Sequence, residues 1–256
     1  MSELGPAFVV SDLHLRGPSG ENTRAFHRFL DQRVAPSGAR LIIVGDLFDW
    51  WYARPGFVPP QFAGVVAALE ALPSVTWIEG NHDMRIARAL RPDTPLDVRA
   101  RPLHGRHRGR SLELRHGDLL DATDREYLAL RGFLRGPFMD AATGLIGARA
   151  SQRVGELVTA ARNRQKGGLG GDHADDGWLR GARGFAAASA AELTVVGHGH
   201  WLGWFPEGLI CLGDWVHWCS YLELPGDAGP RLRRFVDGAD DPILADGAVG
   251  ALPRLV

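Results

Sequence analysis

The chain has 256 residues, of which 45% are hydrophobic and 23% are charged. This composition supports a substantial buried core and excludes an intrinsically disordered protein. The 29 Lys and Arg residues are balanced by 30 Asp and Glu residues, for a formal charge of -1, so the chain has no overall field that would attract nucleic acid. We therefore expect a globular protein with no nucleic-acid partner, and the sequence leads us to infer no protein partner.

The cysteine count and the hydropathy pattern bear on location. The two cysteines, Cys211 and Cys219, are too few for a disulfide framework and fit a reducing compartment. The first residues, MSELGPAFVVSDLHL, lack the basic start and long apolar stretch of a signal peptide. No run reaches the roughly 18 apolar residues of a membrane span. We expect a cytoplasmic protein that touches membranes only at their surface.

The first half of the chain alternates strand and helix patterns. Runs rich in leucine and β-branched residues predict buried strands, and apolar residues at helical spacing predict helices between them. The strands are expected at residues 7–10, 41–44, 75–78, 111–115 and 193–196, and the helices at 22–34 and 61–72. The arginine-rich stretch 99–110, with two glycines, predicts a loop or turn. The alternation predicts an α/β fold.

Between residues 119 and 191 the strand signals stop and a helical pattern takes over. Ala150, Val154 and Leu157 begin one apolar stripe, and Arg131 to Lys166 is a basic stretch. Strand-like runs return at 209–212 and 221–224. We expect a core made of residues 1–118 and 193–256, with residues 119–192 forming a helical cap inserted in the same domain.

Each of the five strands ahead of a motif ends in polar residues. Carboxylate, amide and imidazole side chains recur at these ends, in the segments SDLH, GDLFD, GNHD, HGD and GHGH. If the strands belong to one parallel sheet, their ends lie side by side and these groups converge on one cleft. Oxygen and nitrogen ligands without a thiolate favour Mn, Fe, Zn or a similar divalent metal. Seven such ligands exceed the needs of one tetrahedral ion and would suit two ions about 3.5 to 4 Å apart.

These five motifs, in this order from Asp12 to His200, resemble the calcineurin-like metallophosphoesterases, whose pattern is DxH, GDxxD, GNH(D/E), H and GHxH. The resemblance implies a metallophosphoesterase-type α/β sandwich that binds two metal ions, expected to be Mn²⁺, with Fe, Zn or Mg as alternatives. It implies that one metal is held by Asp12, His14 and His200, that the other is held by Asn81, His116 and His198, and that Asp46 bridges them.

The same resemblance implies roles for three neighbours of the ligands. His82 would lie beside the attacked phosphate as a transition-state stabiliser or proton donor, oriented by Asp83. Asp49 is a candidate for orienting a ligand histidine from behind, although hydrogen bonds to loop backbone explain it equally well. Activated water would be the nucleophile.

Within this superfamily the chain most resembles the bacterial UDP-2,3-diacylglucosamine pyrophosphatases of lipid A biosynthesis. The likeness rests on GDLFDWW, on HGD followed by a helical insertion, and on LGDW before a strand. It implies cleavage of the pyrophosphate of a UDP-linked glycolipid to 2,3-diacylglucosamine 1-phosphate and UMP, with the basic cap on an anionic membrane surface. The expected substrate contacts are Asp124, Tyr127, Arg131, Arg162 and Lys166.

Two departures from that narrower family leave other functions open. Many members have arginine where His82 stands, and they carry GHTHRP where this chain has GHGHWL. A general phosphomonoesterase or phosphodiesterase acting on nucleotides or phosphoproteins is one alternative, although such enzymes commonly lack a cap of this length. A non-catalytic binding scaffold is another, but such proteins lose metal ligands, and here all seven positions are filled.

Overall fold

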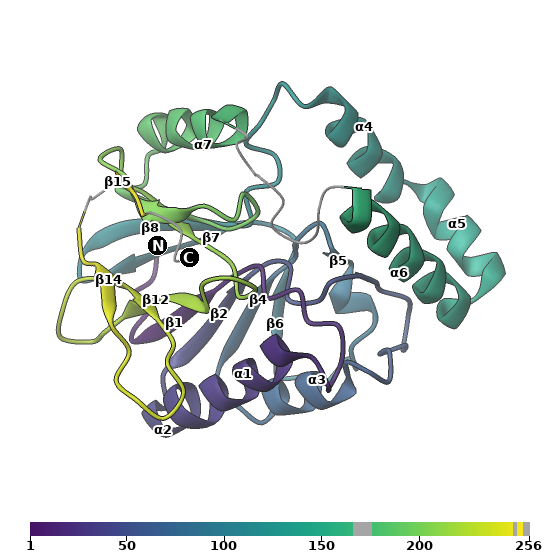
Figure 1. The fold of residues 1–256 in the computed structure, drawn as a ribbon, viewed down its shortest axis with the longest axis horizontal. Coiled ribbons are helices and arrows are strands. Elements are labelled where there is room, and N and C mark those ends of the chain that lie inside the picture. The colour runs from purple at the N-terminus through teal and green to yellow at the C-terminus, as the bar shows by residue number, and fades with distance from the viewer. Residues whose placement is uncertain (166–175, 248–249, 253–256) are drawn as a thin grey trace.

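The computed structural model describes residues 1–165, 176–247 and 250–252. Two β-sheets pack face to face, and helices cover the outer face of each, so the body of the protein has four layers (Figure 1). This arrangement confirms the predicted α/β sandwich with a helical insertion.

The first sheet has seven strands in the order β14-β13-β12-β1-β2-β4-β6. Strands β1, β2, β4 and β6 run parallel, and β12 joins β1 in antiparallel fashion. The bounds are β1 (Ala7–Val10), β2 (Arg40–Val44), β4 (Val75–Ile78), β6 (Asp97–Arg99), β12 (Ser220–Leu224), β13 (Arg231–Arg234) and β14 (Ile243–Ala245).

The second sheet has six strands in the order β15-β10-β11-β9-β8-β7, and β8, β9 and β11 are parallel. The bounds are β7 (Leu103–His107), β8 (Arg110–Arg115), β9 (Leu193–Val196), β10 (Leu202–Trp204), β11 (Leu209–Leu212) and β15 (Gly250–Ala251). A separate two-stranded ribbon pairs β3 (Trp51–Tyr52) in parallel with β5 (Asp83–Met84).

Three apolar clusters join the layers. The middle cluster lies between the two sheets and includes Val9, Ile42, Leu114 and Val195, all fully buried. Strands β1, β4, β9 and β11 are buried on both faces, which is why their sequences are mostly apolar rather than alternating, with one buried threonine each in β4 and β9.

The helices on the first sheet are α1 (Glu21–Phe29), the π-helical turn η1 (Leu30–Val34), α2 (Ala35–Ser37) and α3 (Ala63–Glu70). The short 3-10 turn η2 (Ile86–Arg88) follows β5.

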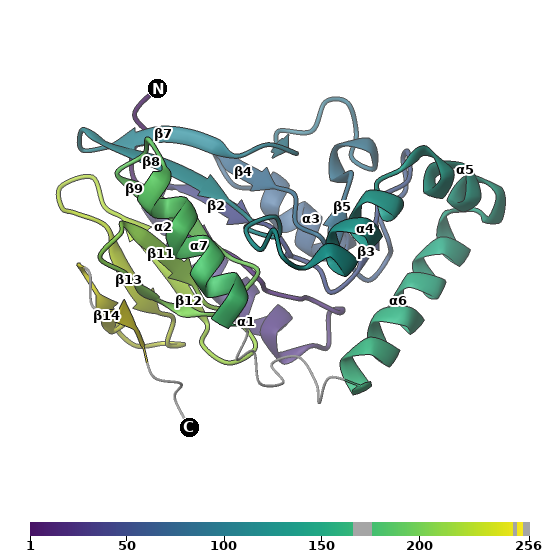
Figure 2. The same cartoon turned by 90° about the horizontal axis from the view of Figure 1, so that it is seen from above.

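Three helices stand apart from the sandwich at one end of the molecule (Figures 1 and 2). They are α4 (Arg125–Leu134), α5 (Pro137–Ile146) and α6 (Ala148–Gln165), and we call them the cap helices. The last helix of the predicted insertion, α7 (Asp176–Ala188), differs. Trp178, Ala182 and Ala186 on α7 pack on the outer face of the second sheet, so α7 forms the fourth layer of the body. No helix in the described ranges is long and apolar enough to cross a bilayer.

The predicted loop at 99–110 is wrong in its middle part. Leu103–His107 is strand β7, which forms a hairpin with β8 through Arg108 and Gly109. Its side chains alternate between buried and exposed positions, and β7 is an edge strand of the second sheet. One polar face and a central glycine conceal this strand from a search for apolar runs.

Candidate metal centre

Five loops from both sheets carry the predicted ligands. Asp12 and His14 follow β1, Asp46 follows β2, and Asn81 follows β4, all in the first sheet. The ligands His116 and His198, with His200, follow β8 and β9 of the second sheet. The expectation that one parallel sheet supplies every loop is therefore wrong. The groups converge because the carboxyl ends of the parallel strands in two stacked sheets meet at the same end of the sandwich.

The structure brings Asp12, His14 and His200 together. Oδ1 of Asp12 lies 3.4 Å from Nε2 of His200 and 3.8 Å from Nε2 of His14, and the two Nε2 atoms are 3.2 Å apart. The candidate ligand atoms of these three residues lie within 4.8 Å of one another. This spacing matches a group of side chains facing one cation.

A second group contains Asp46, His116, His198 and Asn81. Oδ1 of Asn81 is 2.8 Å from Nε2 of His116 and 2.8 Å from Nδ1 of His198. Oδ1 of Asp46 is 3.4 Å from Nε2 of His116. Asp46 also belongs to a group with His14, so its carboxylate lies between the two sets of ligands. That position is compatible with a bridging carboxylate.

The backbone at these ligands is unusual. Asp12, His14, Asp46, His198 and His200 all have φ between 47° and 60°. Residues other than glycine rarely adopt this left-handed conformation, and each such residue costs on the order of 1–3 kcal/mol. Five strained residues in one small region indicate that the packing of the sandwich holds these side chains in a set direction.

The glycine before two of the ligands is required by close approach. A Cβ atom on Gly80 would lie 2.0 Å from Oδ1 of Asp46, and one on Gly197 would lie 2.3 Å from Oδ2 of Asp12. Neither contact is sterically possible. The glycines of GNHD and GHGH therefore let the loops from different strands come together around shared carboxylates.

Two of the ligand histidines are held in the neutral form. Burial lowers the pKa of His14 to about 3 and that of His198 to about 4. A neutral imidazole has a lone pair available for a metal ion. These rings are therefore already in the state that coordination requires.

The other two histidines carry the positive charge of the site. Burial lowers the pKa of His116, but Asp46 outweighs it and raises the value to about 10. Burial acts in the same way on His200, but the neighbouring carboxylates of Asp12 and Asp214 outweigh it and raise the pKa of His200 to about 10. A divalent cation beside these carboxylates would take over the charge that the two imidazoliums supply.

The residues present fit divalent cations. Oδ1 of Asp12 is buried and has no hydrogen-bond partner in the described part of the chain, although it faces the other candidate ligands. The donors are carboxylate and amide oxygens with imidazole nitrogens, and Cys211, although buried, belongs to the α7 core rather than to the site. The structure thus supports metal binding without identifying the metal.

Sequence reasoning gave no role to Asp214, which holds the far side of His200. Oδ2 of Asp214 is 3.3 Å from Nδ1 of His200, and His217 contacts the same carboxylate at 3.0 Å. Burial raises the pKa of Asp214, but its hydrogen bonds with the two histidines bring it well below the usual range. The signal was present in LGDW, a polar motif directly after β11 like those after the other parallel strands.

The Asp83 side chain lies between the GDLFD and GNHD loops. Its buried carboxylate accepts hydrogen bonds from the backbone N–H groups of Asp46, Leu47 and Gly80 at 2.7 to 3.2 Å, and from the indole of Trp77 at 3.3 Å. It therefore ties the GDLFD loop to the GNHD loop. The described contacts of its side chain do not include the ring of His82.

The backbone carbonyl of Asp49 holds the His82 ring. It lies 2.5 Å from Nδ1 of His82 and can only accept, so Nδ1 carries the proton and Nε2 remains available to the site. The carboxylate of Asp49 accepts a hydrogen bond from Nε of Arg16 at 3.0 Å and lies 3.9 Å from Nδ1 of His14. The carboxylate thus lies near a ligand candidate, His14, but its shorter contact is the ion pair with Arg16, and no hydrogen bond from it to loop backbone is found among the described residues.

Of the predicted substrate contacts, Tyr127 and Arg131 lie beside the ligands. The Tyr127 hydroxyl donates to Oδ2 of Asp118 at 3.1 Å, Nε of Arg131 donates to the same oxygen, and the Tyr127 ring lies 5.6 Å from that of His198. The predicted contact Asp124 is instead the N-cap of α4, where it accepts from the N–H of Tyr127 at 2.8 Å. An exposed carboxylate at a helix start is stabilised there by the free N–H groups.

The remaining predicted substrate contacts cannot be placed. Lys166 lies outside the described residues, and so does the side chain of Arg162.

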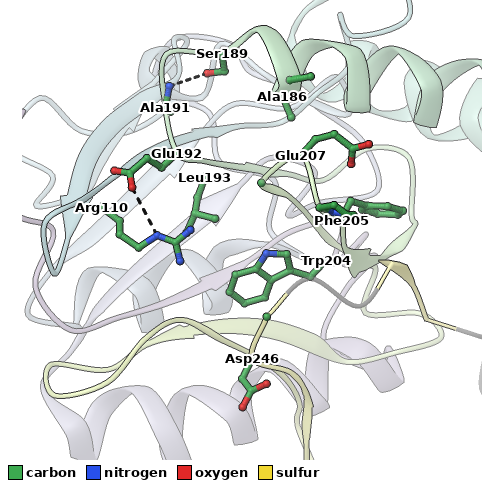
Figure 3. A pocket seen from close by; sticks show the side chains of 14 residues that line it. Arg110, Ala186, Ser189, Ala191, Glu192, Leu193, Trp204, Phe205, Glu207 and Asp246 are labelled. Atoms are coloured by element: carbon green, nitrogen blue, oxygen red, sulfur yellow. Dashed lines mark hydrogen bonds and ion pairs between the residues drawn. The ribbon is translucent and has the colours of Figure 1, made fainter.

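A separate hollow of about 500 Å³ lies at the other end of the second sheet (Figure 3). Arg110 and Leu193, which begin β8 and β9, line it, whereas the candidate metal ligands follow the ends of those strands. Glu192 and Glu207 in its wall are already engaged, since Glu192 accepts from the N–H of Ser111 and Glu207 from Arg183. We assign no chemistry to this hollow.

Fold and site together define the class of protein: a two-sheet α/β sandwich whose strand-end loops form a site for divalent cations. The chain belongs to the calcineurin-like phosphoesterase family, whose model matches residues 5–212.

Curated relatives narrow the comparison. The chain is 34% identical over 132 residues to a UDP-2,3-diacylglucosamine hydrolase of Ectopseudomonas mendocina (strain ymp), a match covering 50% of this chain and 54% of the relative. It is 30% identical over 135 residues to the protein of that name from Ralstonia nicotianae, covering 51% and 50%. The chain spans about half the length of these relatives. Among solved structures, Yfce, a phosphoesterase from E. coli, shares the fold with a TM-score of 0.50, 18% identity, and coverage of 96% of this chain and 100% of that one.

Proposed function

We propose that this protein is a metal-dependent hydrolase that cleaves the pyrophosphate bond of UDP-2,3-diacylglucosamine, giving 2,3-diacylglucosamine 1-phosphate and UMP. The names of the curated relatives support the substrate. The observation that carries the proposal is the cap: α4 contacts the loops that bear the candidate metal ligands through Tyr127 and Arg135, and the cap helices expose large apolar side chains.

The cap helices expose large apolar side chains to solvent, although the stability of a helix does not require them at exposed positions. Leu145 is 90% exposed, Leu157 68% and Phe138 65%, and Phe133 and Ile146 are also exposed. The rings of Phe133 and Phe138 are neighbours, with centroids 5.7 Å apart, and exposed apolar side chains that lie together are typical of a binding surface. A substrate with two acyl chains, a sugar and a diphosphate needs such a surface next to a cationic site.

We assign the ligands as the motifs predict. Asp12, His14 and His200 would hold one ion, Asn81, His116 and His198 would hold the other, and Asp46 would bridge; we propose Mn²⁺ for both. When bound, such ions polarise the phosphoryl group and lower the pKa of water. The protein's own contribution is to orient the ligands through strained loops and through Asp214.

His82 is the proposed acid or transition-state stabiliser. Its Nδ1 atom donates to the Asp49 carbonyl, no hydrogen bond to Nε2 is found within the described residues, and the ring lies 5.0 Å from that of His14. In this role the ring would carry a second proton on Nε2, from which it would stabilise developing negative charge or protonate the leaving oxygen.

We propose Tyr127 and Arg131 as substrate contacts. Burial and the neighbouring Asp118 raise the pKa of Tyr127, so its hydroxyl stays a hydrogen-bond donor at all physiological pH values. Arg131 is half-buried beside the same carboxylate and presents a guanidinium near the site. The exposed arginines Arg149 and Arg153 on α6 would favour an anionic membrane surface, where the lipid substrate resides.

The test is a comparison of two substrates. Purified protein incubated with Mn²⁺ is given UDP-2,3-diacylglucosamine, and UMP and the lipid 1-phosphate are quantified by chromatography; bis(p-nitrophenyl) phosphate is the general substrate. The proposal expects kcat/KM for the lipid nucleotide to exceed that for the nitrophenyl ester by orders of magnitude. Turnover of the nitrophenyl ester alone would contradict it.

One observation favours the alternative, a general phosphoesterase acting on nucleotides or phosphoproteins. GNHD places a histidine at position 82, as in the wider superfamily, where many UDP-2,3-diacylglucosamine pyrophosphatases have arginine. A histidine offers one hydrogen bond where an arginine offers a bidentate pair to a phosphate. If this alternative holds, removing the apolar cap residues will leave kcat/KM for the best substrate unchanged.

A further inference from the structure

The segment from Asp49 to Trp51 holds His82 at two points. The Asp49 carbonyl accepts from Nδ1 of the ring at 2.5 Å, and the N–H of Trp51 donates to the His82 carbonyl at 2.7 Å where β3 pairs with β5. The first bond sets which ring nitrogen carries the proton. A displacement of this segment would therefore move the ring and break its hydrogen bond from Nδ1.

Cap helix α6 holds the same segment from the opposite side. Nε2 of Gln152 donates to the carbonyl of Trp50 at 2.7 Å, and Glu156 accepts from Gln152 at 2.8 Å and from Gln61 at 2.7 Å. The segment that orients His82 is thus hydrogen-bonded to α6 one residue away from the Asp49 carbonyl.

The indole of Trp50 packs directly on the backbone of α6 at Gly155. A Cβ atom at Gly155 would lie 1.6 Å from Nε1 and 2.3 Å from Cε2 of Trp50. Glycine inside a helix costs about 1 kcal/mol relative to alanine. Helix α6 has its glycine at the point where the Trp50 indole packs on it. We infer that the close approach of Trp50 to α6 depends on the missing side chain at Gly155.

Helix α5 holds the far end of the β3–β5 ribbon, which lies between the sandwich and the cap helices (Figures 1 and 2). Asp140 on α5 accepts from the Tyr52 hydroxyl at 3.1 Å and from the guanidinium of Arg85. Tyr52 is paired with Met84 in the ribbon, and Arg85 comes directly after Met84. The ribbon is therefore held between the site and two cap helices.

We propose that the cap sets the position of the His82 ring through Trp50, and that Gly155 and Gln152 are positioning residues for phosphoester hydrolysis. The proposal rests on the catalytic role of His82 given above, but not on the identity of the substrate. Cap docking thereby acts on the reaction even for a substrate too small to touch the cap.

The first test observes the ring directly. In ¹H–¹⁵N NMR spectra of the metal-free protein, the Nδ1 proton of His82, assigned by its loss in His82→Gln, is protected from exchange by the Asp49 carbonyl. Gly155→Ala is expected to broaden or remove this signal. Gly132→Ala makes the same substitution in α4, where nothing lies within 4 Å of the added Cβ, and is expected to leave it unchanged.

The second test is kinetic and uses bis(p-nitrophenyl) phosphate with Mn²⁺. Gly155→Ala is expected to lower kcat about 10- to 100-fold with little change in KM, since small displacements of a catalytic group have effects of this size. In a His82→Ala background the same substitution is expected to have no further effect. Gln152→Ala, which adds no bulk, provides the same comparison if Gly155→Ala does not fold.

Two outcomes overturn the proposal. One is a His82 Nδ1 signal that is unchanged in both Gly155→Ala and Gln152→Ala. The other is a loss of kcat on Gly155→Ala that is equally large with and without His82. Failure to hydrolyse the lipid nucleotide would count against the proposed substrate alone, because neither readout uses it.

Discussion

Asp214 and His200 form a carboxylate–imidazole pair in which Oδ2 of Asp214 lies 3.3 Å from Nδ1 of His200, leaving Nε2 directed at Asp12. A carboxylate behind a ligand histidine fixes the orientation of the ring and makes its other nitrogen a better donor. Removing such a partner typically lowers metal affinity 10- to 100-fold.

We therefore expect Asp214→Asn to weaken Mn²⁺ binding by about 10- to 100-fold, measured by isothermal titration calorimetry, with a small change in melting temperature. Asp237→Asn, which removes a surface carboxylate paired with Arg28, is the control and should leave affinity unchanged. Equal affinities for the Asp214 variant and the wild type would rule out this role.

Asp83→Asn should lower stability rather than act on one catalytic step. Its carboxylate accepts three backbone N–H groups from two loops, and an amide would turn an NH₂ group towards at least one of them. An unsatisfied buried donor costs about 1–3 kcal/mol, so the free energy of unfolding in urea should fall by that amount. A stable variant with a selective loss of kcat would instead support the original expectation that Asp83 orients His82.

Asp46→Asn should abolish turnover while the protein stays folded. The carboxylate lies between the two groups of ligands, and an amide cannot supply the negative charge that two cations share. Elemental analysis after Mn²⁺ incubation should find fewer bound ions than in the wild type, with a circular dichroism spectrum unchanged. Unfolding without a prior loss of metal would show that the residue is structural.

Metal binding should release protons at pH 8. The pKa values of His116 and His200 are raised to about 10, so both rings are protonated at that pH and must lose the proton to coordinate. We expect about two protons released per chain, seen as a dependence of the titration heat on the ionisation enthalpy of the buffer. Affinity should also rise between pH 7 and 9, because proton competition falls. Heats that are identical in Tris and HEPES would contradict this.

The exposed apolar residues of the cap should matter only for a lipid substrate. Phe138→Ser is expected to lower kcat/KM for UDP-2,3-diacylglucosamine about tenfold, the effect of losing one apolar contact of 1.5 kcal/mol or so. Activity on bis(p-nitrophenyl) phosphate should not change. Ile243→Ser, at an exposed apolar position on β14, is the matched control and should affect neither substrate.

Most of the fold was predictable because the buried strands are short runs of mostly apolar and β-branched residues. The predicted strands at 7–10, 75–78 and 193–196 have those same bounds in the structure. Strand β7 was not predicted because an edge strand needs only one apolar face. Helix α7 was grouped with the cap because helical periodicity does not reveal which surface a helix covers.

The order of side chains along the chain determined by itself which residues could serve as ligands, because a carboxylate or imidazole directly after a buried strand is confined to the end of the sheet. Only the tertiary structure decided how those ends meet. The stacking of two sheets brings His198 against Asn81, places Asp214 behind His200, and turns Asp83 towards backbone N–H groups. Hydrogen bonds between residues far apart in sequence depend on the angle and spacing of the packed layers. A local pattern of residues determines neither the angle nor the spacing.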